Sequence, residues 1–183
     1  FYANDAVSIP AGVSAYVATS VPTMKNGVGQ LEMTEIKNGV IPSKTGVVIR
    51  AEEGEYVFNS TDQTGTLVEN NLMRGYAGES EYKEISLPSD HSVNYVFADD
   101  EEGVKFYRKD SAFRVYNNKA YLNLPASVAA ARVIYFSFDD DETGIWETEN
   151  GDVKTENCYD LSGRRVEKAQ KGVYIVNGKV VVR

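Results

Sequence analysis

The sequence predicts an all-β protein: an antiparallel β-sandwich of the jelly-roll or Ig-like kind, followed by a small C-terminal β-meander. Three observations carry this prediction. Short runs rich in Val, Ile, Tyr and Phe recur along the chain. Many of them alternate apolar with polar residues, which is the period of a half-buried strand. Turn-forming residues separate them at short intervals, as in antiparallel sandwiches.

The strand signal occurs in eight runs. In one of them Val104 and Phe106 flank a lysine, so one face is apolar and the other polar. The predicted strands are SAYVATSV (14–21), GQLEMTEI (29–36), TGVVIRA (45–51), EYVF (55–58), VNYVFA (93–98), VKFYRK (104–109), KAYLNL (119–124) and RVIYFSF (132–138). Glycine-containing turns are expected at 25–27, 37–39, 52–55 and 99–103.

A short pattern occurs three times. IPAGVSAYV begins at Ile9, IPSKTGVVI at Ile41 and VYNNKAYLN at Val115. Each copy has an apolar residue, three or four turn-forming positions, a small residue and then an apolar strand. We interpret the unit as a turn that leads into a core strand, because its spacing is too irregular for a solenoid repeat.

The character of the chain changes after the last of these strands. Before the change, PASVAAAR (125–132) is the one helical candidate; Ser127 would cap it, and it is long enough for a turn or two. From Asp139 the sequence is acidic and turn-rich. We therefore expect a sandwich body over 1–145, an acidic linker over 146–157 and a meander over 158–183.

The C-terminal meander should contain two hairpins. Their turns fall at Ser162-Gly163 and Asn177-Gly178, and Asn-Gly suits a type I′ turn. Residues 158–183 hold six basic and two acidic side chains, a net charge of +4, whereas the rest of the chain carries -12. A sheet of this size is marginally stable on its own. The basic charge of the tail fits either docking of the tail on the anionic body or recognition of the tail by separate machinery.

Composition limits the classes of function. The chain has 183 residues, enough for one domain or one domain with an appendage, and a net charge of -8 that disfavours nucleic acid and anionic membranes as partners. One cysteine, Cys158, and one histidine exclude an intrachain disulfide and most metal sites built from these ligands. No apolar run approaches the ~20 residues of a membrane helix. Without an initiator Met or a leader-like start, we expect a processed chain or a piece of a larger parent.

The tail carries a specific resemblance. YDLSGRRV…KGVYIVNGKVVV resembles a shortened form of the C-terminal sorting domains that the type IX secretion system of Bacteroidetes reads. Those domains have a YDxxGRxV hairpin, a GxYxV strand and a basic, apolar end. The matching residues are Tyr159, Asp160, Gly163, Arg164, Val166, Gly172, Tyr174 and Val176.

The body is similar to modules found near the ends of large Bacteroidetes surface proteins. The similarity lies in SIPAGVSAYVA, GVIPSKTGVVIRAEEGEYVF, NNLMRG, GVKFYRKDSAFRVYNNKAYLNLP and FDDDETGI. It implies an all-β extracellular module, secreted or on the bacterial surface, behind upstream domains of a larger parent. It implies no catalytic residue.

Residues with catalytic or metal-binding chemistry do not form a recognisable motif. His91 lies between Asp90 and Ser92, and because neighbours in sequence rarely converge into a triad, we expect a loop histidine. The acidic clusters at 99–102 and 139–142 lack EF-hand spacing, so solvated turns are the simpler interpretation. The second cluster is the better calcium candidate, through Asp139, Asp140, Asp141 and Glu142.

Aromatic residues give the one indication that the protein recognises a ligand. Exposed rings stack on sugars, although most tyrosines in β proteins pack in cross-strand pairs. We name Trp146, Tyr76 and Tyr82 as candidate glycan contacts, because they lie in the linker or flank the loop-like AGESE stretch.

The sequence thus predicts a non-catalytic surface module that scaffolds, attaches or sorts a larger exported bacterial protein, without a resident cofactor. The alternative is a glycan-binding or adhesion module that contacts a cell-surface glycan or protein through exposed aromatics. An enzyme is the weakest interpretation, since 27 acidic residues supply no specific carboxylate pair.

Overall fold

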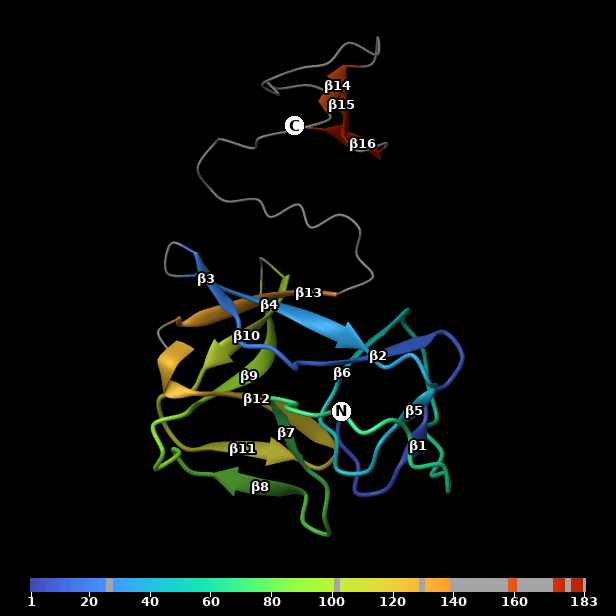
Figure 1. The fold of residues 1–183 in the computed structure, drawn as a ribbon, viewed down its shortest axis with the longest axis vertical. Coiled ribbons are helices and arrows are strands. Elements are labelled where there is room, and N and C mark those ends of the chain that lie inside the picture. Colours follow the sequence, from blue (N-terminus) through green and yellow to red (C-terminus); the bar gives the residue numbers. More distant parts are fainter. Residues whose placement is uncertain are drawn as a thin grey trace. The chain divides into compact units, whose positions relative to one another are not determined.

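The computed structural model describes residues 1–25, 28–100, 103–128, 131–138, 158–160, 173–176 and 179–182. The chain divides into two compact units, Phe1–Glu142 and Thr143–Arg183. The first unit is the body and the second contains the tail strands (Figure 1). The division falls three residues before the predicted end of the body at 145.

Within the described residues the regular secondary structure is almost all β-strand. In chain order the elements are β1 (Val7–Ser8), β2 (Val13–Val17), β3 (Thr23–Lys25), β4 (Val28–Glu35), β5 (Val40–Ile41), β6 (Val48–Ala51), β7 (Met73–Tyr76), β8 (Tyr82–Ile85), β9 (Val93–Asp100), β10 (Gly103–Arg108), β11 (Phe113–Tyr116), β12 (Lys119–Leu124), the 3-10 helix η1 (Ala126–Val128), β13 (Val133–Phe138), β14 (Cys158–Asp160), β15 (Val173–Val176) and β16 (Lys179–Val182).

The all-β prediction is confirmed, and the body is sandwich-like. Nine strands form one sheet in the order β6-β2-β4-β13-β10-β9-β12-β7, with β3 beside β4; β1 with β5, and β8 with β11, form two smaller sheets. Among the described pairings one is parallel, that of β4 with β13, which sets Gly29 opposite Ile134. A Cβ at Gly29 would collide with the end of the Ile134 side chain, which would then have to move.

The long sheet folds over, so that β6 and β7 at its two ends approach each other. Just before β6, a Cβ at Gly46 would lie 2.9 Å from the Cβ of Met73. The Asn71 side-chain amide donates to the Gly46 carbonyl (2.9 Å), and the Leu72 N–H donates to the Ala18 carbonyl (2.7 Å). Only a residue without a side chain permits this close approach.

The main core fills the space that the folded sheet encloses. Alternate residues of the central strands face it, as the period of a strand requires. Its buried members are Tyr16, Ala18, Leu31, Met33, Val48, Met73, Tyr95, Phe106, Leu122, Leu124, Ala131 and Ile134. A second cluster beside β1 and β5 contains Val7, Ala15, Val17, Ile36, Ile41 and Val47.

Strand β12 changes partner along its length. Its second half pairs with β9, with Leu122 opposite Tyr95 and Leu124 opposite Val93. Its first half pairs with β7 on the other edge, with Ala120 opposite Gly75. Beyond Tyr95 the described pairings of β9 are with β10 alone, so β9 and β12 separate there.

The threefold sequence pattern corresponds to one structural unit. Its first two copies pair with each other, since β1 lies against β5 and β2 against β6. Its turn places a residue in the left-handed region in every copy, at Gly12 (φ 78°), Lys44 (φ 55°) and Asn118 (φ 59°). The interpretation as a turn that leads into a strand agrees with this geometry.

The strand predicted for EYVF (55–58) is wrong. Its aromatic residues make other contacts in place of strand pairing. The ring of Phe58 stacks on Phe1 with centroids 4.6 Å apart, and the Tyr56 hydroxyl donates to the Glu52 carbonyl. In the helical candidate, the described structure is limited to the single 3-10 turn η1. Six short strands of the body were missed: β1, β3, β5, β7, β8 and β11.

The described part of the tail is a three-stranded antiparallel sheet in the order β14-β15-β16. Tyr159 lies opposite Ile175, and Ile175 opposite Val180. A meander of three or four strands was predicted, and these three form one. The predicted turns at 162–163 and 177–178 lie outside the described residues.

The left-handed turn positions give a stability prediction. Gly12→Ala should destabilise the body by about 1 kcal/mol, because a side chain is strained at this φ although open space surrounds it. Lys44→Gly should stabilise it by about 0.5 kcal/mol by relieving the same strain. Urea unfolding measures both. Ser43→Gly is the control and should be destabilising; an equal loss in Lys44→Gly would contradict a left-handed Lys44.

Candidate functional site

An exposed aromatic pair lies on the small β8–β11 sheet. Tyr82 and Tyr116 are directly opposite each other in the register and are 37% and 49% exposed. Their rings meet edge to face, with centroids 6.0 Å apart. The Arg114 guanidinium carbon lies 4.4 Å from the centre of the Tyr82 ring, within cation–π range. One surface therefore presents two aromatic rings beside a multiple hydrogen-bond donor.

The three predicted glycan contacts do not all lie on this surface. Tyr82 does, whereas Tyr76 is half-buried on β7, which belongs to the large sheet. Trp146 lies outside the described residues. Sequence reasoning missed Tyr116, although the Asn117-Asn118 turn that follows it places Tyr116 at a strand end.

A cavity of about 540 Å³ lies where β12 separates from β9. Side chains and backbone of β6, β9, β11 and β12 line it, together with Phe1 and Met73. Phe97 of β9 is 42% exposed at this point although its ring packs on Phe106 and Phe136, with centroid distances of 5.2 and 5.5 Å. Continuing the β9–β12 register would place Ala120 opposite Phe97, so the separation of the strands accounts for the uncovered ring.

The charged residues that line this cavity are basic. They are Arg114 of β11 and Lys119 of β12. The amino group of Phe1 donates to the Val47 carbonyl (2.7 Å), and burial, helped by the charge of Lys119, lowers its pKa to about 5. The positively charged side chains at the cavity are those of Arg114 and Lys119.

The neighbourhood of His91 is a turn. His91 is exposed and adopts φ 64°, and the N–H of Ser92 donates to an Asp90 carboxylate oxygen at 3.0 Å. Hydrogen bonds from Ser92 hold the pKa of Asp90 below its usual value. The Ser92 hydroxyl also accepts from the Asn123 side chain at 3.0 Å. The three neighbouring residues therefore stabilise the start of β9.

A buried amide pair joins β9 and β12 just before they separate. The side-chain N–H of Asn123 donates to the side-chain oxygen of Asn94 (2.8 Å), which is 2% exposed. The backbone N–H of Asn123 donates to the Leu72 carbonyl (2.9 Å). Because a buried amide needs its partners, this pair favours the observed register.

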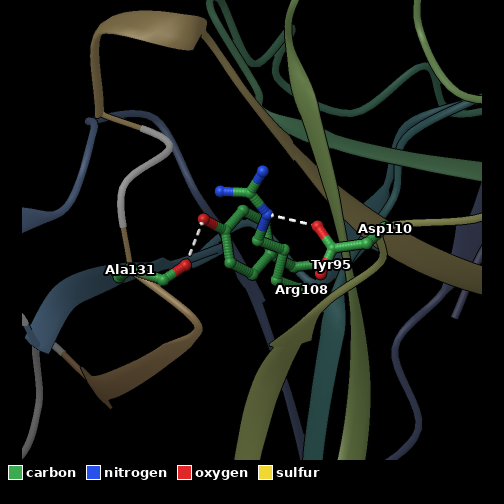
Figure 2. Close-up of polar contacts among 4 residues, drawn as sticks. All are labelled: Tyr95, Arg108, Asp110 and Ala131. Carbon is green, nitrogen blue, oxygen red and sulfur yellow. Dashed lines mark hydrogen bonds and ion pairs between the residues drawn. The ribbon is translucent and has the colours of Figure 1, made fainter.

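A second buried polar contact lies at the other side of β9 (Figure 2). The Tyr95 hydroxyl donates to the buried carbonyl of Ala131 at 2.8 Å and fixes the segment that leads into β13. Burial raises the pKa of Tyr95, so the hydroxyl keeps its proton. In the nearby Arg108–Asp110 ion pair (2.7 Å) the Asp110 side chain is 73% exposed, so solvent screens the interaction.

The predicted calcium ligands Asp139, Asp140, Asp141 and Glu142 lie outside the described residues. Across the described part of the chain, no three His, Cys, Asp or Glu side chains are grouped to hold a metal ion. In the other acidic cluster, Asp99 pairs with Val104 in the β9–β10 hairpin.

Four residues of the sorting-like motif lie in the tail sheet. Tyr159 and Asp160 belong to β14, and Tyr174 and Val176 to β15, with Asp160 directly opposite Tyr174. The other four, Gly163, Arg164, Val166 and Gly172, lie outside the described residues.

Comparisons with known proteins match this chain to no family model, no curated protein and no solved structure. Among the described residues, no helix is long and apolar enough to cross a membrane. The chemistry of the site therefore has to be inferred from the body's own geometry.

The Tyr95 contact gives a second stability prediction. Tyr95→Phe should cost about 1–2 kcal/mol, because the buried Ala131 carbonyl loses a donor. Tyr56→Phe is a matched control, since its hydroxyl donates to the Glu52 carbonyl at an exposed site, and it should change stability little. Chemical denaturation measures both. Equal losses in the two variants would contradict a specific role for the buried bond.

Proposed function

We propose that this chain is a non-catalytic extracellular β module that scaffolds, attaches or sorts a larger exported bacterial protein at the cell surface. The observation that carries the proposal is the division into two β units: a large body and a three-stranded tail that holds part of the sorting-like motif. The acidic body and the basic tail add a charge difference that separate machinery could recognise.

The use of polar side chains in the body supports a structural role. Asp90 and Ser92 stabilise a turn, and Asn94 and Asn123 join two strands. Tyr95 holds the segment before β13. Each of these groups has a partner that explains its presence without chemistry on a substrate.

Deleting residues 158–183 from the full parent protein tests the sorting role. We expect surface display to fall by at least about tenfold while the body still folds, because the two units are compact separately. Cell-surface labelling and immunoblotting of the periplasm measure this. A tail of the same composition in scrambled order is the control and should fail equally. Unchanged display of the deleted protein would reject sorting by the tail.

A second candidate is glycan binding, which the Tyr82–Tyr116 surface favours. Tyr116 presents about half of its surface to solvent, and the Arg114 guanidinium lies beside the pair. Aromatic faces stack on the apolar faces of sugar rings, and guanidinium donors suit hydroxyl or acidic groups.

A glycan array followed by titration of the best ligand tests this candidate. Tyr116→Ala should weaken binding about tenfold, in line with the loss of one stacked ring. Tyr56→Ala, which removes a tyrosine from another part of the body, should not weaken it. Absence of any array signal at high protein concentration, or equal binding by Tyr116→Ala, would count against glycan recognition here.

A further inference from the structure

The cavity between β9 and β12 combines an apolar interior with a basic rim. We propose that it binds an apolar carboxylic acid of the fatty-acid class, with the hydrocarbon chain inside and the carboxylate at Arg114 and Lys119. This inference goes beyond the proposed function and does not depend on it.

The apolar wall is the first argument. Phe97 lines the cavity and is 42% exposed, even though Phe106 and Phe136 hold its ring in place. Val47 and Val115 lie in the lining as well. Covering apolar surface that is already held in place is favourable, because that surface is removed from water. Such a wall suits a hydrocarbon chain better than a sugar, whose hydroxyls need hydrogen-bond partners.

The charge of the lining is the second argument. The chain as a whole is acidic, with a net charge of -8, yet the charged lining residues are Arg114 and Lys119. Among the described residues of that lining there is no Asp or Glu. Arg114 has Glu84 as its cross-strand neighbour, and its guanidinium lies over the ring of Tyr82, which is outside that lining. A carboxylate is the complement of this rim, and charge-assisted hydrogen bonds would fix its end.

Size is the third argument. About 540 Å³ lies within the range of roughly 300–1,000 Å³ that is usual for small-molecule sites. The cavity arises from the separation of two strands that are paired firmly on either side of it, β9 with β10 and β12 with β7. Its walls are therefore largely preformed, which reduces the cost of ordering on binding.

Dodecanoate, below its micelle-forming concentration, is the probe for the intact 183-residue chain. Isothermal titration calorimetry should give one site with a dissociation constant in the range of about 1–100 μM, given the modest apolar area available. Dodecanol, which has the same chain without the charge, should bind at least about fivefold more weakly. In NMR spectra, the methyl signals of Val47, Val115 and Ala120 should shift on binding.

Three variants locate the site. Arg114→Gln and Lys119→Gln, at exposed positions where folding should be unaffected, should each weaken dodecanoate binding about three- to tenfold and leave dodecanol unchanged. Ala120→Leu should fill the cavity and weaken both ligands. Lys37→Gln removes a lysine from an exposed turn away from the cavity and should change neither.

Several outcomes would overturn the proposal. They are the absence of dodecanoate binding, equal binding of dodecanol, or binding that is unaffected by both charge variants. Binding of an extended peptide along the free edge of β9, with no response to dodecanoate, would also overturn it and would assign the cavity to strand addition. Because none of these measurements concerns export or glycans, they are distinguishable from failure of the proposed function.

Discussion

The body depends on the way β12 divides its pairing between two neighbours. Leu122 is the pivot, since it lies opposite Tyr95 of β9 on one side and Met73 of β7 on the other. At this point β12 separates from β9 and pairs with β7 alone. Strand β7 thereby comes close to the other end of the sheet, where Gly46 allows its backbone to lie against Met73. The same divergence uncovers Phe97 and opens the cavity. Closure of the core and formation of the site are thus two consequences of one pairing arrangement.

Polar contacts favour this division of the β12 pairing over other registers of β12 against β9. The Asn94–Asn123 contact joins β9 to β12 within one residue of the pivot, and a shift in register would leave a buried amide without a partner. Tyr95 joins the other side of the same strand to Ala131. Together these contacts fix β9 to its neighbours on both sides.

Much of this fold follows from local sequence, and the site follows from it only in part. Alternation predicted the long strands, and the recurring pattern predicted turns; the structure adds that each turn has a left-handed residue, at Gly12, Lys44 and Asn118. The missed strands are mostly short, and on β8 three of four residues are exposed, so little apolar pattern marks them. EYVF has the pattern but no partner strand, because Phe58 packs on Phe1 instead. The cavity could not be predicted, since it arises where two distant strands lose their common register. Tyr82 was identified from its flanking loop, and its partner Tyr116 only from the pairing of β8 with β11.

The separation of β9 from β12 can be measured directly with backbone nuclear Overhauser effects in solution. The structure requires cross-strand effects that join Leu122 to Tyr95 and Leu124 to Val93, and effects that join Ala120 to Gly75. The structure predicts that no nuclear Overhauser effect joins the backbones of Ala120 and Phe97. Observation of the Ala120–Phe97 effect would mean that the ladder continues, that the ring of Phe97 is covered, and that the cavity does not exist.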